Sequence, residues 1–85
     1  MSYKVVLRPS AQRDLKRLSH DLHNRVLDVL LALQSQPRPT GVKKLQGQVN
    51  QWRIRIGVLR ILYEIYDGEK LVRIFRIAHR RDVYR

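Results

Sequence analysis

The apolar residues of this chain change their spacing once, and this change constrains the fold more than any other feature. Before residue 36 they recur every three or four positions, as in Leu15, Leu18 and Leu22, which is the period of an amphipathic α-helix. Segment 36–41, with the sequence QPRPTG, combines two prolines with a glycine and is typical of a break between elements. From Trp52 onward, apolar and charged residues alternate, which is the period of a half-buried β-strand. Helices are therefore predicted first and a sheet second.

The first half is predicted to contain one short strand followed by two helices. Residues 3–8 alternate weakly and include two valines, which predicts a strand. Ser10 precedes a helix that begins at Ala11, and Ser19 precedes a second helix over residues 20–35. A serine at either position can act as an N-cap, because its side chain accepts a hydrogen bond from the first backbone N–H groups. The two segments are predicted to form a helical hairpin.

The second half is predicted to form three strands joined by tight turns. They cover Trp52–Ile56, Leu59–Tyr66 and residues 71–78, with a glycine and an Asp-Gly pair at the turns. Tight turns imply antiparallel neighbours, so the expected fold is α+β with the order β-α-α-β-β-β. In this fold the helical hairpin packs on one face of a small, mainly antiparallel sheet. A chain of 85 residues fits one domain, which we expect to cover residues 1–85.

Alternation within the first strand after the break separates apolar from basic side chains. Trp52 and the two isoleucines are assigned to the core, and Arg53 and Arg55 to the opposite face. Because the helices cover only one face of the sheet, the other face is free to bind a partner. We expect Arg53, Arg55 and Arg60 to be exposed on it.

The net charge indicates the class of partner. Eighteen Lys and Arg residues against seven Asp and Glu residues give a formal net charge of +11, and most of the cations are arginine. Arginine pairs with phosphate through parallel N–H groups, whereas lysine offers a flexible point charge. A domain with this excess repels itself, so the composition predicts a polyanionic partner: nucleic acid, an acidic protein or an anionic membrane surface.

Composition also disfavours several kinds of site and location. The chain has no cysteine, which excludes disulfides and thiolate metal sites. No apolar run approaches about 18 residues, and the first residues lack the pattern of a secretory signal, so we expect a cytoplasmic protein that does not span a membrane. His20 and His23 share a helix face without a third ligand, and no phosphate-binding loop motif is present. We therefore expect no metal and no cofactor.

Basic side chains from several segments are predicted to meet on the free face of the sheet. Arg53 and Arg55 emerge about 7 Å apart on one strand, Arg60 lies on the next strand, and Arg80 follows the last one. The outer members of this cluster, expected to bind RNA, are Lys43, Lys44 and Arg81. The alternative is a solvated basic face, as on any half-exposed sheet. Like charges on one face repel, which favours a bound partner.

Two residues near the end of the sequence could move protons. Tyr84 lies close to Arg80 and Arg81, and neighbouring cations favour the phenolate form; its ring could also stack on a base. The alternative is a tail residue whose ring packs on the domain. His79 could supply a proton near neutral pH or only end the strand.

The seven carboxylates are not paired in a way that predicts acid–base catalysis or Mg²⁺ binding. A nuclease of this composition would therefore act on RNA, where the ribose 2′-OH attacks its own phosphodiester. Such an enzyme needs a base for the 2′-OH, cations for the developing negative charge and an acid for the leaving 5′-oxygen. DNA lacks this internal nucleophile.

Four segments together resemble a known family. They are KLQG at residues 44–47, WRIRI at Trp52–Ile56, LRILY at residues 59–63 and HRRDVY at residues 79–84. Over essentially its whole length the chain resembles the RelE side of the RelE/ParE toxin superfamily. The resemblance implies a toxin of a type II toxin–antitoxin pair that cleaves mRNA in the ribosomal A site and stops translation. It also implies an acidic antitoxin that masks the basic surface, and contact with operator DNA only through the toxin–antitoxin complex.

The resemblance assigns roles to individual residues. Arg53 and Arg55 match the basic pair of the strand, Arg60 the phosphate-binding arginine, Arg80 the arginine after the last strand, and Tyr84 the C-terminal tyrosine. The best-known RelE member carries lysines where Arg53 and Arg55 stand. Arginine stays protonated, so the general base is assigned to Tyr84, with Arg80 at the leaving oxygen and His79 as a rival proton donor.

Two other functions are compatible with these residues. A ParE-like inhibitor shares the fold and poisons DNA gyrase by binding alone, although the set of four arginines and a tyrosine argues against it. A plain RNA-binding module would use the basic face without chemistry. The leading hypothesis is a ribosome-dependent endoribonuclease that needs no metal.

Overall fold

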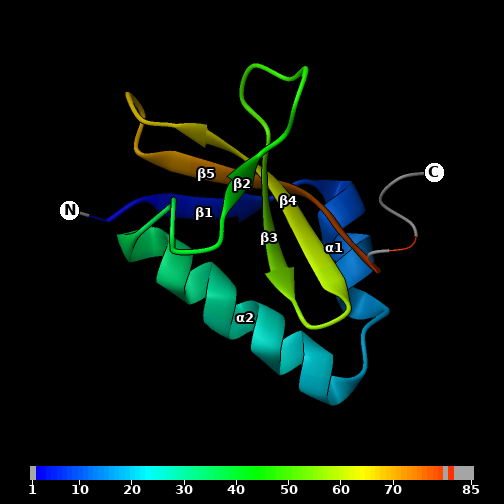
Figure 1. Cartoon of the computed structure of the whole chain (residues 1–85). Coiled ribbons are helices and arrows are strands. Elements are labelled where there is room, and N and C mark those ends of the chain that lie inside the picture. Colours follow the sequence, from blue (N-terminus) through cyan, green and yellow to red (C-terminus); the bar gives the residue numbers. More distant parts are fainter. Residues whose placement is uncertain (1, 80, 82–85) are drawn as a thin grey trace.

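The computed structural model describes residues 2–79 and residue 81, which form a five-stranded sheet with two helices packed on one side (Figure 1). The elements are β1 Lys4–Leu7, α1 Pro9–Lys16, α2 His20–Ser35, β2 Lys43–Lys44, β3 Trp52–Ile56, β4 Leu59–Tyr66 and β5 Leu71–His79. Within these residues, neither helix is long and apolar enough to cross a membrane.

The strands lie in the order β1-β5-β4-β3-β2, and β1 and β5 are the parallel pair. The helical hairpin carries the chain from β1 at one edge to β2 at the other, and the antiparallel β3, β4 and β5 lead it back. This arrangement confirms the α+β prediction of a helical hairpin on one face of a mainly antiparallel sheet. The two-residue β2 was not predicted, because a pair of lysines shows no alternation.

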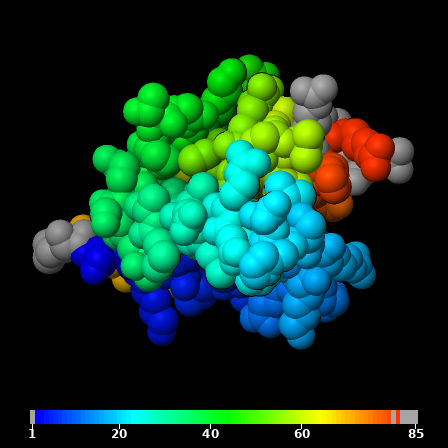
Figure 2. Space-filling view, turned by 90° about the horizontal axis from the view of Figure 1, so that it is seen from below, coloured from blue at the N-terminus to red at the C-terminus, as the bar shows by residue number. Residues whose placement is uncertain are grey.

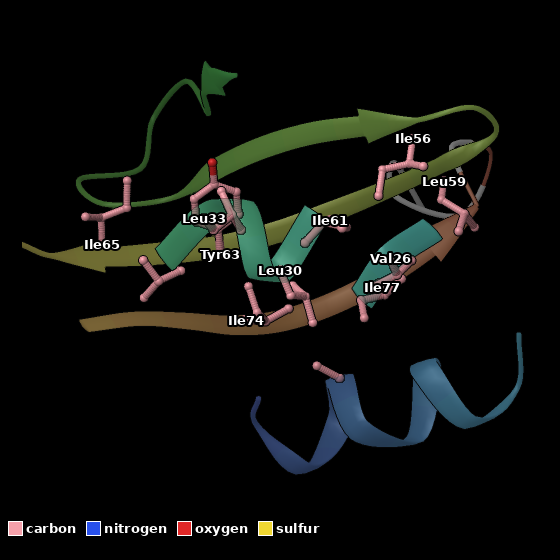
Figure 3. Packing of buried hydrophobic residues seen from close by; sticks show 12 residues of the cluster. Val26, Leu30, Leu33, Ile56, Leu59, Ile61, Tyr63, Ile65, Ile74 and Ile77 are labelled. Atoms are coloured by element: carbon pink, nitrogen blue, oxygen red, sulfur yellow. The ribbon is translucent and has the colours of Figure 1, made fainter. Parts of the chain in front are cut away.

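The hydrophobic core lies between the helices and one face of the sheet, as Figure 3 shows. α1 contributes Ala11, and β4 contributes every second residue from Leu59 to Ile65. The buried residues of α2 are Val26, Leu30 and Leu33. Trp52 packs against this cluster as predicted. Each fully buried Leu, Ile or Val side chain contributes about 1.5–3 kcal/mol to folding, so this layer holds the sheet on the helices.

The two helices begin in different ways. Ser19 accepts a hydrogen bond from the backbone of the first turn of α2 at 3.4 Å, which confirms it as the N-cap. α1 begins at Pro9, two residues earlier than predicted, and Arg8 at its N-cap makes no side-chain cap bond. Proline suits the first helical turn, where a missing N–H needs no replacement. The prediction of Ser10 as a cap is wrong, because its hydroxyl donates to the Phe75 carbonyl at 2.8 Å.

An asparagine side chain replaces a missing strand partner beside β4. β3 begins at Trp52, which pairs with Tyr63, so the Ile65 backbone lies beyond the end of β3. The Asn50 amide donates to the Ile65 carbonyl at 2.8 Å, and its oxygen accepts from the Ile65 N–H at 3.2 Å. The same oxygen accepts from the Trp52 indole N–H at 3.0 Å. Asn50 therefore satisfies backbone groups that a longer strand would otherwise pair.

Helix α1 takes a similar place beside β5. β1 ends at Leu7, so among the described residues no strand lies on the outer side of residues 75–79 of β5. α1 lies there, and its Asp14 carboxylate accepts a hydrogen bond from the Ile77 N–H at 2.9 Å. Together with the Ser10 bond, this contact ties the helix to the backbone of the strand.

Residues 36–41, which the sequence predicted to separate the helices from the sheet, are held against the turn between β4 and β5. The Asp67 carboxylate accepts two hydrogen bonds from the Arg38 guanidinium, at 3.2 and 3.0 Å, and one from the Tyr3 hydroxyl at 2.6 Å. These donors lower the pKa of Asp67 to about 2, and the same contact raises the pKa of Tyr3. The Arg38 guanidinium also lies 4.9 Å from the centre of the Trp52 ring. The break is thus an ordered connection.

Candidate nucleic-acid interface

Strands β3 and β4 carry basic residues on the sheet face opposite the helices, which we call the open face. Arg55 on β3 pairs directly with Arg60 on β4, and Arg53 lies two residues along β3 on the same face. Directly opposed residues of antiparallel strands have Cβ atoms about 4.5–5.5 Å apart. The register therefore brings together three of the predicted catalytic residues, Arg53, Arg55 and Arg60, which we call the arginine triad.

The members of the arginine triad differ in depth. Arg60 is 3% exposed although it is charged, and Leu62, on the same face of β4, is 6% exposed. The expectation that Arg60 is exposed is therefore wrong, whereas Arg55 is exposed and Arg53 is half-buried. A cation that is partly removed from water interacts more strongly with an anion, because the local dielectric constant is lower. Arg60 is therefore the buried member of the triad, and Arg55 is the exposed one.

The two lysines predicted at the rim lie on different faces of the sheet. Lys43 pairs with Arg53 and shares the open face. Lys44 pairs with Trp52, and its ammonium lies 5.8 Å from the centre of the Trp52 ring. The register therefore brings Lys43 to the arginine triad, while Lys44 lies on the helix side.

His79 also lies on the helix side of the sheet. It pairs with Leu59, whose side chain is in the core, so the two side chains share that face. There His79 lines a hollow of about 190 Å³ together with Asp14 and Arg17 of the α1 region. The structure thus separates His79 from the arginine triad.

The remaining predicted residues follow β5. Arg81 is exposed in a turn. Arg80 and Tyr84 lie outside the residues that the structure describes. Their roles beside the arginine triad stay predictions.

Alternation fails to predict one basic residue of the open face, Arg76. It pairs with Leu62, and Arg73 pairs with Glu64, so both arginines lie on the open face. Three residues apart in a regular strand, they would point to opposite faces. The extra residue Phe75 forms a bulge between them, which turns Arg76 back to the same face. No pattern in the sequence marks this bulge.

Arg73 and Arg76 have different surroundings. The Arg73 guanidinium donates to the Glu64 carboxylate and to the Tyr66 hydroxyl, both at 2.9 Å, and the glutamate raises the pKa of Arg73. Arg76 is exposed and forms no ion pair or side-chain hydrogen bond within the described residues. The same holds for Arg55 in that part of the chain. Arg55 and Arg76 therefore remain available for an external anion.

The arginine triad is suited to phosphate. Guanidinium groups stay protonated and present paired N–H donors that match the oxygens of a phosphate. Like charges directly opposite each other destabilise a sheet, and a bound anion would relieve the repulsion between Arg55 and Arg60. Across residues 2–79 and 81, no group of three His, Cys, Asp or Glu side chains is placed to hold a metal ion.

A known protein family and known toxin sequences match the chain along its length. The family described as ParE toxin of type II toxin-antitoxin system, parDE, matches residues 5–84. Toxin RelG of Mycobacterium tuberculosis is 31% identical over 86 residues, which cover 100% of this chain and 99% of that protein. A putative RelE toxin of Methanocaldococcus jannaschii is 25% identical over 88 residues, which cover 100% of this chain and 98% of that protein.

Solved structures share the fold. A chain of the toxin–antitoxin complex RelBE2 from Mycobacterium tuberculosis has a TM-score of 0.85 and 30% identity, covering 96% of this chain and 95% of its own length. A chain of the archaeal RelE–RelB complex from Pyrococcus horikoshii has a TM-score of 0.85 and 25% identity, covering 96% and 99%. A chain of the intact RelBE complex from E. coli, at 18% identity and a TM-score of 0.81, covers 92% and 96% and is similar in fold. With a family match over nearly all of its residues, the chain belongs to the RelE/ParE superfamily of toxins of type II toxin–antitoxin systems.

Proposed function

We propose that this toxin is a ribosome-dependent endoribonuclease that cleaves mRNA in the A site and thereby inhibits translation. The observation that carries the proposal is the register of β3 and β4, which pairs Arg55 with Arg60 and places Arg53 on the same face. Binding to a polyanion would need only exposed cations, whereas Arg60 is 3% exposed. A cation held in place before the reaction is suited to charge that develops in the transition state.

In the proposed reaction, the ribose 2′-oxygen forms a bond to the adjacent phosphorus while the bond from phosphorus to the 5′-oxygen breaks. The products are a 2′,3′-cyclic phosphate and a free 5′-hydroxyl. The proton of the 2′-OH passes to a base, and the leaving 5′-oxygen takes a proton from an acid. Arg55 and Arg60 stabilise the charge that develops on the phosphate oxygens, and Arg53 holds the neighbouring phosphate.

The base must lie outside the arginine triad, because arginine stays protonated. We assign this role to Tyr84, on the resemblance of residues 79–84 to the RelE pattern. Arg80 stabilises the charge on the leaving oxygen, which takes its proton from solvent water because arginine stays protonated. The place of His79 on the helix side of the sheet argues against it as the proton donor. Lys43, which faces the same side as the triad, is assigned to flanking RNA.

The proposal includes an acidic antitoxin as partner. The similar chains from Mycobacterium tuberculosis and Pyrococcus horikoshii occur in toxin–antitoxin complexes, and a net charge of +11 favours an acidic partner. An apolar groove of about 290 Å³ lies between β1 and α2, which are neighbours in Figure 2, and includes the exposed Leu27 and Leu31. Exposed apolar patches commonly mark protein contacts, so we place an antitoxin segment there. Leu31→Asp should weaken antitoxin binding and leave RNA cleavage unchanged.

Cell-free translation tests the proposed activity. Purified toxin is added to a translation extract, and the 5′ ends of the mRNA are mapped by primer extension. We expect cuts within A-site codons that disappear when ribosomes are omitted. Intact mRNA in an extract whose translation the toxin has stopped would overturn the proposal.

Inhibition of DNA gyrase by binding is the second candidate function. It is favoured by the description of the matching family, which names the ParE toxin. A DNA supercoiling assay on the same preparation separates the two candidates. Trapped gyrase–DNA complexes together with intact mRNA would replace the nuclease proposal by this one.

A further inference from the structure

Helix α1 and the end of β5 form a second basic region that the proposed cleavage step does not use. Two adjoining hollows, of about 460 and 190 Å³, lie along the outer edge of β5 where α1 replaces a strand. Asp14, Arg17 and Arg76 line both hollows, Arg13 lines the larger and His79 the smaller. We call the two hollows together the edge trough.

The cations of the edge trough are available to a ligand. Arg13, Arg17 and Arg76 are exposed, and within the described part of the chain none of them forms an ion pair or a side-chain hydrogen bond. The Asp14 carboxylate between them is engaged with the Ile77 N–H. Three guanidinium groups around one hollow, with their N–H donors turned to no protein acceptor in this region, favour an anion with several oxygens.

Arg76 connects the edge trough to the arginine triad. It pairs in register with Leu62, Leu62 pairs with Arg53, and Arg53 pairs with Lys43. Because neighbouring strands lie about 4.8 Å apart, this row spans about 14 Å of the open face. It places cations on β2, β3 and β5 and then reaches the edge where Arg13 of α1 and Arg17, just after α1, add two more.

We propose that the edge trough binds the phosphate backbone of the same RNA strand that crosses the arginine triad, at nucleotides away from the cleaved bond. The inference rests on the proposed nuclease function and extends the substrate that the site would hold. A polynucleotide carries one charge at every nucleotide along a continuous backbone, which suits a row of cations that continues around an edge. Phosphate contacts of this kind position a strand without reading its sequence.

Helix stability explains only part of the edge trough. Arg13 and Lys16 lie in the last turn of α1, where cations interact favourably with the helix dipole. That effect does not account for Arg76, which lies on β5. Lys16 does not line the trough, so it serves as a control that shares the helix but not the site.

Fluorescence anisotropy of labelled single-stranded nucleic acid tests the inference with the full chain. The probes carry 2′-deoxyribose to prevent cleavage and are about three or about ten nucleotides long. For the double variant Arg13→Gln and Arg17→Gln, we expect roughly tenfold weaker binding of the long probe, with a salt slope smaller by about 0.7 for each phosphate that is no longer neutralised. The short probe should bind as it does to the wild type. The control, Lys4→Gln with Lys16→Gln, removes the same charge and should change neither probe.

Asp14→Asn provides an opposite test in the same assay. The amide oxygen can still accept the Ile77 hydrogen bond, while the negative charge in the edge trough is removed. Binding of the long probe should therefore strengthen, by about twofold to threefold. Misfolding does not produce a gain of this kind.

The outcomes separate this inference from the proposed function. Long-probe binding that is equal in the arginine variant and its control would overturn the edge trough, while cleavage in the translation extract would still support the nuclease. Weaker binding to an acidic antitoxin alone would assign the trough to a peptide. Weaker binding to ribosomes alone would assign the trough to ribosomal RNA. Either result would overturn the proposal that one RNA strand crosses both the arginine triad and the edge trough. A wild-type protein that binds neither probe would overturn the edge trough as an RNA site, while cleavage in the translation extract would still decide the nuclease proposal.

Discussion

The two ends of the sheet differ in the charged side chains that lie next to each other. At the end with the β4–β5 turn, Arg38 pairs with Asp67 and Arg73 with Glu64, at 3.0 and 2.9 Å. At the end with the β3–β4 turn, an arginine lies opposite another arginine across the two strands. We call these regions the paired end and the basic end.

From this difference we infer that the paired end stabilises the fold and the basic end binds the ligand. A cross-strand pair of like charges reduces stability. The paired end offsets this cost through hydrogen bonds that link distant segments, such as those of Asn50 and Asp67. Substitutions at the two ends should therefore affect different measurements.

Arg55→Gln at the basic end should produce the largest effect. Loss of one group that stabilises charge in the transition state lowers a rate by about 10²–10³, so we expect mRNA cleavage in the translation extract to fall by about that factor. The melting temperature should stay equal or rise, because the repulsion between Arg55 and Arg60 is relieved.

Lys4→Gln is the matched control for this prediction. Lys4 of β1 pairs with Leu71 of β5, so it lies on the open face of the sheet but at the paired end. Its loss removes the same charge and should leave cleavage unchanged. Equal loss of cleavage in both variants would mean that total charge, rather than the arginine triad, determines activity.

Asn50→Ala should have the largest effect at the paired end. It leaves the Ile65 N–H, the Ile65 carbonyl and the Trp52 indole N–H without their partner. Unsatisfied polar groups cost about 1–3 kcal/mol each when buried, and this site is half-buried, so we expect the free energy of unfolding to fall by about 2–4 kcal/mol. Denaturant titration measures this change.

Asn50→Asp separates the two halves of that bond network. The aspartate still accepts from Ile65 and Trp52 but no longer donates to the Ile65 carbonyl. Its loss of stability should lie between those of the wild type and the alanine variant. Cleavage per folded molecule should stay unchanged in both variants, and a fall that parallels Arg55→Gln would contradict the separation of the two ends.

The basic end was largely predictable from the sequence because its geometry is local. Alternation assigns Arg53 and Arg55 to one face, and a two-residue turn between Ile56 and Leu59 sets the register that brings Arg60 opposite Arg55. Alternation gives the face of a residue but not its depth, which is why the burial of Arg60 was not predicted.

The features that the sequence did not predict depend on contacts between distant segments. The bulge at Phe75 forms where β1 stops and α1 takes its place, and it alone turns Arg76 to the open face. In the sequence Asn50 is typical of a loop residue, and its contact with the backbone follows only from the position of β4 beside it. Neither Lys43 nor Lys44 has an alternating neighbour, so their faces followed only from pairing with β3.

Tyr63→Phe should have a smaller effect on stability than Asn50→Ala. The Tyr63 side chain is fully buried, which raises the pKa of its phenol, and its hydroxyl donates to the Pro37 carbonyl at 2.9 Å. Phenylalanine keeps the packed ring but leaves a buried carbonyl unsatisfied, which costs about 1–2 kcal/mol. The melting temperature should fall by about 4–8 °C for each kcal/mol. An unchanged melting temperature would show that the attachment of residues 36–41 adds little to the paired end.

Asp67→Asn should produce the smallest effect on stability, and this effect should disappear in acid. The hydrogen bonds from Arg38 and Tyr3 lower the pKa of Asp67 from 3.8 to about 2 in the folded protein. The charged carboxylate is therefore favoured by folding, and its contribution to stability is complete above about pH 4 and is lost as the pH falls towards about 2. Because Asp67 is more than half exposed, solvent screening keeps the contribution small.

Denaturation midpoints of the wild type, Asp67→Asn and the neighbouring control Glu69→Gln, measured across that acid range, check this prediction. The wild type and the control should lose stability more steeply than Asp67→Asn between about pH 4 and pH 2, because only they keep the aspartate that must be protonated. If all three curves run in parallel, the contacts of Asp67 with Arg38 and Tyr3 do not stabilise the fold. The stability of the paired end would then come from the neutral hydrogen bonds of Asn50 and Tyr63. The ion pairs of Arg38 and Arg73 would neutralise these two cations without stabilising the fold.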